Sequence, residues 1–228
     1  MVVEQSRQLA LGVRLDDDAT FDNFHVSAGN RVVVTALQDP AQPVILVWGN
    51  LASGRTHLLQ AACHREDGQS IYIPGTEKSQ LDPAILDEVE QLQLVCIDDV
   101  ESIAGDPDWE QALFHAINTC NGGSTRLLLS ANAPPGQLAI DLPDLQSRLQ
   151  QALVFHLHDL NDTDKLAAFR FRATKRGMTV PLEVGEYIMQ RSERSLAVLM
   201  DILERLDSSS LERQRRITIP LVKATLDW

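Results

Sequence analysis

Residues 46–62 read LVWGNLASGRTHLLQAA, in which an apolar strand runs into a glycine-rich turn and a helix then opens at Thr56. Gly49 and Gly54 have the G-x-x-x-x-G-K-[ST] spacing of a phosphate-binding loop, but Arg55 stands at the lysine position. Such a turn presents backbone N–H groups to one point, and the helix adds its positive end. The arginine keeps the charge as a planar fork. The stretch therefore predicts phosphate binding, with an ordinary strand-to-helix turn as the alternative.

A second motif, LVCIDDV at 94–100, is an apolar strand that ends in Asp98 and Asp99. A strand beside a phosphate loop that ends in Asp is where the magnesium ion of a nucleotide is held. We therefore expect Asp98 to be the metal-side ligand and Asp99 to lie near an attacking water, with Thr56 in the same magnesium site. A solvated strand end is the alternative for the aspartates, but the order of the two motifs favours a phosphate-loop fold.

Apolar runs alternate with helical patterns from residue 20 to about 156. The runs predicted to be buried strands are 44–48, 70–73, 92–100, 126–132 and 152–157. The segments between them are long enough for crossover helices, which predicts a mainly parallel sheet. Residues 31–37, RVVVTAL, are ambiguous, because the β-branched run favours a strand while the position suits a helix. From about residue 160 the period is helical, with helices expected over 162–177, 181–192, 195–210 and a final short segment at 217–226.

The composition sets limits on function. The chain has 228 residues, 44% hydrophobic and 23% charged, with a net charge of -12, which is typical of a soluble globular protein of one or two domains. No basic cluster is evident, which argues against strong sequence-specific DNA binding. The widely spaced Cys63, Cys96 and Cys120 suggest reduced thiols in the cytoplasm. Neither a membrane span nor a signal peptide is predicted.

Six segments follow the order found in the AAA+ core of the DnaA family of bacterial replication initiators. They are TFDNFHVSAGN (20–30), WGNLASGRTHLLQAA (48–62), LVCIDDVESIAG (94–105), LLLSANAPP (127–135), LPDLQSRL (142–149) and ITIPLVKATL (217–226). The match lacks the helicase-loading and helix-turn-helix domains of the initiators. Together with Arg55 in its G-R-[ST]-H-L-L context, this arrangement resembles the Hda family, DnaA-related regulators that inactivate DnaA after initiation.

The resemblance implies an α/β AAA+ fold, a phosphate-loop parallel sheet flanked by helices and followed by a small helical lid. The implied domains are a flexible leader (1–19), a nucleotide-binding domain (20–158) and the lid (159–228). A nucleotide, expected to be ADP with Mg²⁺, would lie between domain and lid. The implied nucleotide-binding residues are Phe24, Val26, Asn30, Gly49, Ser53, Gly54, Arg55, Thr56, His57 and Arg194.

Two further positions follow from the resemblance. Asn132 matches the polar sensor of the γ-phosphate, although an asparagine before Ala133 and two prolines is also a common turn residue. Ala197 stands where the initiators have a second sensor arginine, and Arg194, three residues earlier, is the candidate substitute. Loss of that arginine favours ADP over ATP.

Arg148 matches the arginine finger that reaches the ATP of a neighbouring initiator molecule. Such a finger stabilises charge on the transferred phosphoryl group and is worth roughly 10³–10⁵ in rate. The alternative is a surface arginine paired with Asp144, four residues earlier on the helix. With the family context, Arg148 is the leading catalytic candidate, acting in trans, and Asn132 is the second.

The leader contains QLALGV at 8–13, which resembles the Q-L-x-L-x-L peptides that bind the bacterial sliding clamp. Gln8 is expected to anchor by hydrogen bonds, while Leu9, Leu11 and Val13 make apolar contacts. Gly12 replaces the usual proline, which lowers preorganisation. An ordinary disordered tail is the alternative.

These features predict a negative regulator of chromosomal replication initiation. Bound to ADP and to the DNA-loaded clamp of DNA polymerase III, it would stimulate ATP hydrolysis on DnaA and hydrolyse little ATP itself; a second copy of the chain is a further candidate partner. An autonomous AAA+ ATPase of the clamp- or helicase-loader kind and a DnaA-like DNA-binding adaptor are the alternatives. Arg55, Ala197 and the absence of Glu after Asp98 disfavour the first, and the acidic balance disfavours the second. A nucleotide kinase explains neither the lid nor the leader.

Overall fold

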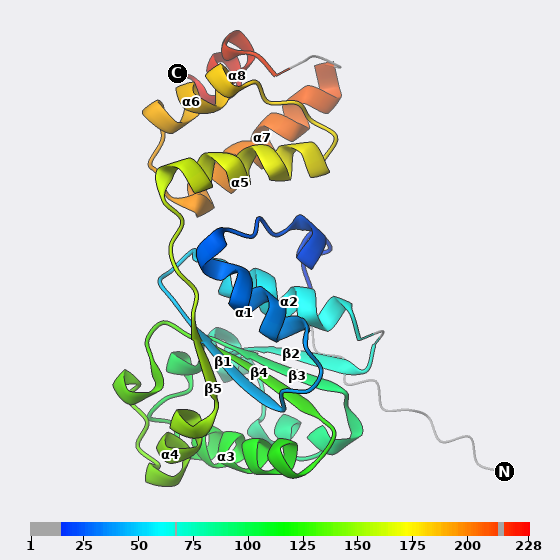
Figure 1. The fold of residues 1–228 in the computed structure, drawn as a ribbon, viewed down its shortest axis with the longest axis vertical. Coiled ribbons are helices and arrows are strands. Elements are labelled where there is room, and N and C mark those ends of the chain that lie inside the picture. Colours follow the sequence, from blue (N-terminus) through cyan, green and yellow to red (C-terminus); the bar gives the residue numbers. More distant parts are fainter. Residues whose placement is uncertain (1–14, 67, 214–216) are drawn as a thin grey trace, which may run out of the picture.

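The computed structural model describes residues 15–66, 68–213 and 217–228. In these residues a sheet with helices on both faces forms a larger part, and a bundle of helices is stacked on it as a lid (Figure 1). The predicted clamp-binding residues Gln8, Leu9, Leu11 and Val13 lie outside the described residues. No helix in the described ranges has the length and apolar character needed to span a membrane.

The sheet confirms the predicted parallel arrangement. Its order is β2-β3-β4-β1-β5, and every neighbouring pair is parallel. The strands are β1 (Val44–Trp48), β2 (Ser70–Pro74), β3 (Leu94–Asp98), β4 (Arg126–Ala131) and β5 (Leu153–His156). The run predicted over 92–100 is shorter as a strand, because Asp99 adopts a left-handed conformation with φ of 55° and turns the chain. All the strands therefore end at one edge, beneath the lid.

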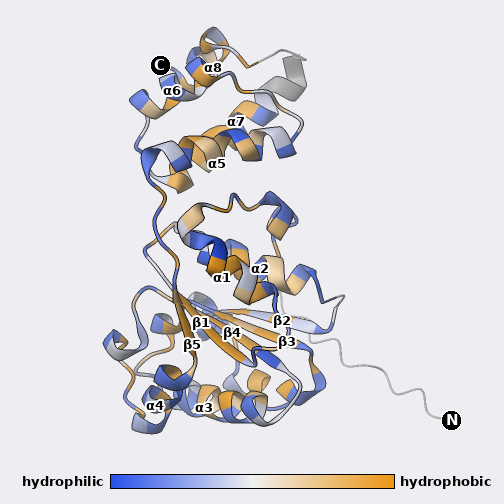
Figure 2. Ribbon diagram, viewed as in Figure 1, coloured by the Kyte–Doolittle hydropathy of each residue, from blue (hydrophilic) through white to orange (hydrophobic). Residues whose placement is uncertain are grey.

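Two helices cover each face of the sheet. Helices α1 (Arg31–Gln38) and α2 (Arg55–His64) lie on the lid side, and α3 (Pro107–Gly122) and α4 (Pro143–Gln151) lie on the far side (Figure 1). Because successive side chains of a strand alternate between faces, the odd positions of β1 pack with α1 and α2, and its even positions pack with α3 and α4. Strands β1 to β4 are largely buried on both faces and are among the most hydrophobic elements (Figure 2), whereas the edge strand β5, predicted to be buried, is half-buried and its Leu153 is 39% exposed.

Residues 31–37, which the sequence left ambiguous, form helix α1. Val33, Val34 and Leu37 are buried against the sheet and α2. Val32 on the opposite side is 66% exposed. The helical spacing of the buried positions lets one face of a short β-branched segment cover the sheet, and this packing overrides local strand preference.

The lid has a hydrophobic core of its own. Its helices are α5 (Asp162–Lys175), α6 (Leu182–Arg191), α7 (Leu196–Arg213) and α8 (Ile219–Leu226). Their buried side chains, including Phe169, Ile188, Leu199 and Val222, form a cluster separate from those of the sheet. Short 3₁₀ helices occur elsewhere, at Phe21–Asn23, Ala28–Asn30, Gly75–Gln80, Pro83–Leu86, Val89–Gln91, Val100–Ser102 and Pro135–Gln137.

A buried carboxylate fixes the loop that leads into α4. Glu110 of α3 is 1% exposed. Its carboxylate accepts backbone N–H bonds from Gly105 (2.7 Å), Asp141 (3.0 Å) and Leu142 (2.7 Å). These bonds satisfy backbone donors of the segments before α3 and α4 and offset the cost of burying the charge.

Replacing Glu110 with Gln should destabilise the protein, because a neutral amide offers one acceptor oxygen where three donors converge. We expect the free energy of unfolding to fall by about 1–3 kcal/mol. Urea denaturation followed by circular dichroism measures this, with Glu186→Gln on the exposed face of α6 as the matched control. Equal urea midpoints for both variants would show that the Glu110 contacts contribute nothing.

Candidate functional site

The phosphate loop joins β1 to α2 and needs its glycines. Gly54 has φ of 102°, and a Cβ there would lie 2.8 Å from the Phe24 ring. A Cβ on Gly49 would lie 2.6 Å from the carbonyl oxygen of Leu157. The turn is therefore closed on one side by Phe24 and on the other by the chain after β5. The first backbone N–H groups of α2 have no partner within the helix and are available to an anion.

A cavity of about 500 Å³ lies between this loop and the lid. It is lined by the loop and α2, by the segment that precedes α1, by Asp99, and by the lid residues Leu160, Ala168, Arg172, Leu196, Ala197 and Met200. Six of the predicted nucleotide-binding residues line it, namely Phe24, Ser53, Gly54, Arg55, Thr56 and His57. A volume of this size is within the range of small-molecule sites.

Four other predicted nucleotide-binding residues are not among the residues that line the cavity. Asn30 is buried, donates to the carbonyl oxygen of His158 (3.0 Å) and accepts from its N–H (2.9 Å). Val26 packs against the hydrophobic core, and Gly49 donates its N–H to Ala131. Arg194 has a 60% exposed side chain and pairs with Asp162 at 2.6 Å. Contact of these four with a ligand stays a prediction.

Two buried polar atoms of the phosphate loop have no hydrogen-bond partner: Ser53 Oγ and Arg55 Nη1. Both residues are less than 10% exposed and line the cavity. Unsatisfied buried polar groups are uncommon in folded proteins and call for a physical explanation. They are polar atoms that no group among the described residues satisfies, on two residues that line the cavity.

Arg55 is held by carboxylates at the end of β3. Its Nη2 lies 3.1 Å from Asp99 Oδ1, and its Nη1 lies 3.7 Å from Glu101 Oε1. Burial, together with the charges of Asp98 and Glu101, raises the pKa of Asp99 to about 6, and Arg55 only partly opposes this shift. The arginine is therefore the cation that neutralises this crowded group of acids.

Asp98 is 2% exposed, and neighbouring hydroxyl groups surround it. Tyr72 donates to its Oδ2 (2.7 Å), and Ser130 donates to its Oδ1. Burial and the Asp98 charge raise the pKa of Tyr72, so the phenol stays a donor. Asp98 is thus engaged by hydroxyls and Asp99 by Arg55. This arrangement does not fit the magnesium site expected at Thr56, Asp98 and Asp99.

Asn132 and Arg148, the predicted catalytic residues, are not among the residues lining the cavity. Asn132 is exposed after β4 and donates its backbone N–H to Glu101 (3.1 Å). Arg148 is half-buried on α4 and donates to Gln151 at 3.4 Å. Among the described residues it has no ion pair with Asp144 or any other acid, so the local pairing considered from the sequence is not formed.

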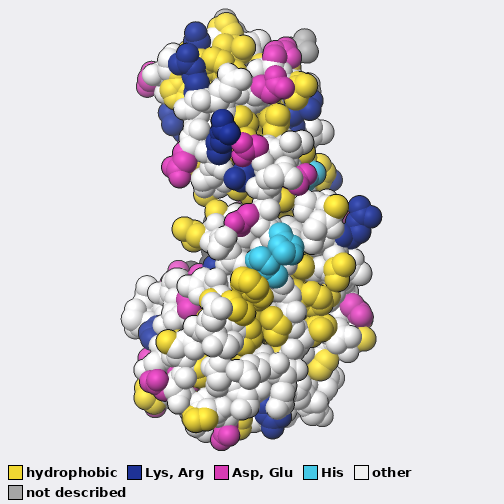
Figure 3. Space-filling view, turned by 60° about the vertical axis from the view of Figure 1, so that its left-hand side comes forward, with side chains coloured by type: hydrophobic (Ala, Val, Ile, Leu, Met, Phe, Trp, Pro, Cys, Tyr) yellow, Lys and Arg dark blue, Asp and Glu magenta, His cyan; other side chains and the backbone are white. Residues whose placement is uncertain are grey.

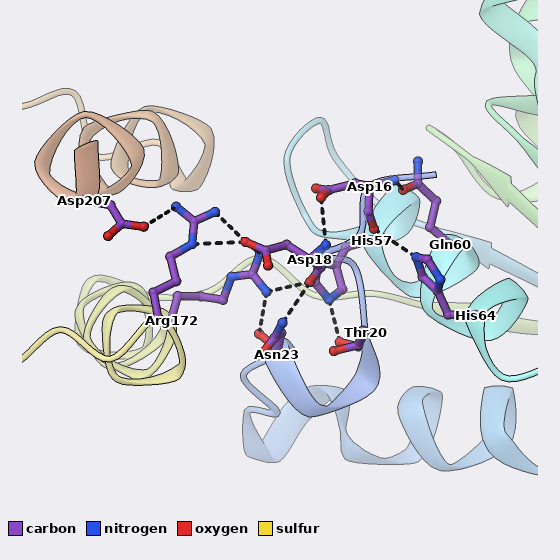
Figure 4. Close-up of polar contacts among 10 residues, drawn as sticks. Asp16, Asp18, Thr20, Asn23, His57, Gln60, His64, Arg172 and Asp207 are labelled. Atoms are coloured by element: carbon purple, nitrogen blue, oxygen red, sulfur yellow. Dashed lines mark hydrogen bonds and ion pairs between the residues drawn. The ribbon is translucent and has the colours of Figure 1, made fainter. Parts of the chain in front are cut away.

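Arg172, a lid residue of α5 that lines the cavity, was not predicted from the sequence. Figure 4 shows it reaching the segment before α1, where it donates to the carbonyl oxygens of Asp18 (2.9 Å) and Asn23 (3.4 Å). The side chain of Asp18 pairs with Arg176 at 2.6 Å. Burial lowers the pKa of Arg172, mainly through desolvation. Arg172 and Arg176 are four residues apart in the sequence, and this spacing alone does not single them out. Only their tertiary contact with Asp18 distinguishes them from other basic residues.

One wall of the cavity is aromatic and neutral. The Phe24 and His57 rings lie 5.5 Å apart, and His57 shares a hydrogen bond with the carbonyl oxygen of Thr20 (2.8 Å; Figure 4). Burial lowers the pKa of His57, which favours the neutral ring. This wall offers a planar ligand group a surface on which to stack.

The histidines near the end of β5 do not belong to this cavity. Histidine side chains gather on one face of the molecule beside hydrophobic ones (Figure 3). His156 stacks on Trp48 with ring centroids 3.8 Å apart, and His158 lies edge-on to His156 at 4.1 Å. Packing against aromatic rings accounts for this pair.

Comparisons with known proteins agree with this architecture. Residues 162–226 match the family model "Hda, lid domain". Domain III of the replication initiation protein DnaA from Thermotoga maritima is similar in structure, with a TM-score of 0.77 at 19% identity over 94% of this chain and 98% of that chain. AMPPCP-bound DnaA from Aquifex aeolicus has a TM-score of 0.70 at 21% identity over 87% of this chain and 68% of that chain.

A Holliday junction branch migration motor, RuvB from Thermotoga maritima, is also similar in fold, with a TM-score of 0.66 at 15% identity over 92% of this chain and 71% of that chain. The match to the Hda lid model covers only the C-terminal helices, whereas these structural similarities also extend over the core. The chain therefore combines a core that has the fold of DnaA domain III with C-terminal helices that match the Hda lid domain.

Proposed function

We propose that this protein binds ADP between its core and lid and acts as a negative regulator of replication initiation in the cytoplasm. In this role it stimulates hydrolysis of the ATP bound to DnaA through Arg148, while its leader holds it on the DNA-loaded sliding clamp. The observation that supports nucleotide binding is that Ser53 and Arg55, which line the cavity, each have a buried polar atom without a hydrogen-bond partner, Ser53 Oγ and Arg55 Nη1. The Hda lid supports the regulatory part.

A nucleotide suits both ends of the cavity. At one end the phosphate loop offers backbone N–H groups, Ser53 and Arg55, which are the donors that a phosphate group accepts from. On the lid side Ala168 and Met200 provide an apolar surface for a base, and Phe24, whose ring lies against Gly54, adds an aromatic one. AMPPCP, a nucleotide analogue, binds the DnaA of Aquifex aeolicus, which has a similar fold.

A diphosphate suits the charges better than a triphosphate. Beyond Arg55 lie the carboxylates of Asp99 and Glu101, which would repel a third phosphate group. Ala197 lines the cavity without offering a cation, and Arg172 is engaged with Asp18 and Asn23. We therefore favour ADP and a protein that hydrolyses little ATP itself.

Action in trans is consistent with the position of Arg148. Helix α4 covers the face of the sheet opposite to α2, so the arginine is separated from the cavity of its own chain. Its side chain has no carboxylate partner among the described residues, which leaves the guanidinium available to a partner molecule. A guanidinium stabilises charge that develops on a transferred phosphoryl group.

Replacing Gly54 with Ala should weaken ADP binding at least about tenfold, because positive φ strains any other residue and the Cβ meets Phe24. Isothermal titration calorimetry measures the affinity. Gly122→Ala is the matched control, since a Cβ there meets nothing within 4 Å. Absence of ADP binding to the unchanged protein would contradict the proposed nucleotide site.

Arg148→Ala should abolish most stimulation of ATP hydrolysis on DnaA and leave ADP binding and the melting temperature unchanged. Arg148→Lys should also fail, because one ammonium cannot reproduce the two-pronged guanidinium contact. Single-turnover assays with labelled ATP loaded on DnaA measure the rate. Arg191→Ala removes an exposed arginine of α6 and is the control. Full stimulation by Arg148→Ala would exclude this arginine as the finger.

Replacing Gln8, Leu9 and Leu11 together with Ala should abolish binding to the sliding clamp, because the peptide loses its amide anchor and two apolar contacts. The melting temperature should stay the same. Surface plasmon resonance with immobilised clamp measures binding, and Glu4→Ala in the same leader is the control. Undiminished binding by the triple variant would place the clamp contact elsewhere.

A further inference from the structure

The carboxylates at the end of β3 already have partners. Asp98 accepts hydrogen bonds from Tyr72 and Ser130, one on each oxygen, and is buried. Asp99 is paired with Arg55, and its backbone N–H is held by Ser130 Oγ at 2.9 Å. Both oxygens of Asp98 therefore already accept a hydrogen bond, and Asp99 already faces a cation.

Magnesium makes strict demands on such a site. It requires near-octahedral oxygen ligands at about 2.0–2.1 Å and in nucleotide sites links protein carboxylates to phosphate oxygens. The guanidinium of Arg55 pairs with Asp99, the residue next to Asp98, which the sequence predicts to be the metal-side ligand. A second cation at this place would be repelled by the first.

The two terminal nitrogens of Arg55 are placed differently, one bonded to Asp99 and one without a hydrogen-bond partner. Its Nη2 bonds Asp99 at 3.1 Å, while its Nη1 is buried without a hydrogen-bond partner and the residue lines the cavity. The nearest acid to Nη1 is Glu101 at 3.7 Å, beyond hydrogen-bonding distance. A guanidinium can bond two oxygens at once with separate nitrogens, which an ammonium does with far less directional control.

We propose that Arg55 takes the place of the magnesium ion, bonding Asp99 with Nη2 and an oxygen of the bound diphosphate with Nη1, so that the nucleotide binds without a divalent cation. This inference rests on the proposed nucleotide site and adds to it the form of the ligand, which is metal-free ADP. It also gives the arginine at the lysine position a function: the side chain supplies the bridge as well as the positive charge.

The test is calorimetric titration of the full chain with ADP in excess MgCl₂ and again in excess EDTA. For the unchanged protein the dissociation constant should differ less than about threefold between the two conditions, because the charge and the bridge come from Arg55. Arg55→Lys supplies an ammonium that cannot bridge, and its affinity should fall about tenfold or more when EDTA replaces magnesium.

The matched control is Arg126→Lys, a buried arginine whose side chain donates to the carbonyl oxygens of Leu37 and Gln42, away from the cavity. It should behave like the unchanged protein in both buffers. Circular dichroism melts show whether each variant is folded, and the comparison on the unchanged protein decides even if Arg55→Lys does not fold.

Three results would overturn the inference, and they are distinguishable. Binding of ADP to the unchanged protein only in magnesium contradicts the metal-free site and leaves the nucleotide site standing. Binding in neither buffer contradicts the nucleotide site itself. Equal affinity of Arg55→Lys in both buffers shows that the guanidinium is no substitute for a metal.

Discussion

The ion pair between Arg55 and Asp99 joins the two motifs on which the candidate site depends. Arg55 opens α2 directly after the phosphate loop, and Asp99 directly follows β3. Their 3.1 Å contact therefore holds the loop against the edge of the sheet. A buried ion pair is favourable only when its polar atoms are satisfied, and one nitrogen of Arg55 has no partner. The loop thus has a geometry that a bound anion would complete.

The contact between core and lid is the second constraint. Asp18 precedes the first helix, yet it bonds Arg176 of the lid, 158 residues later in the sequence. Arg172 adds bonds to two carbonyl oxygens of the same segment. Because the cavity lies between these parts, any group that fills it changes the balance of contacts that set the lid position. Within residues 15–19, which the domain prediction assigned to a flexible leader, Asp18 makes this contact with the lid, while Asp16 donates its backbone N–H to Gln60 of α2.

The parallel sheet could be predicted because its strands are continuous apolar runs. Strand β1 occupies the predicted residues 44–48, since a strand buried on both faces leaves no ambiguity of period. Residues 31–37 could not be assigned, because Val32, Val33 and Val34 favour a strand locally. Their helix depends on covering the sheet beside α2, a contact with residues that lie far along the chain.

The candidate site, like the fold, could be predicted from the sequence only in part. Glycine spacing in 49–54 and the paired aspartates after β3 identified the phosphate loop and its neighbouring strand, because these patterns depend on local backbone geometry. The partner of each charged side chain could not be predicted in this way. Charged pairs form between residues that lie far apart in the sequence, so local patterns do not specify them. The sequence by itself determined where the loop and the strand ends lie. Only the tertiary structure decided that Arg55 faces Asp99 and that Arg172, unlike Arg194, reaches the cavity.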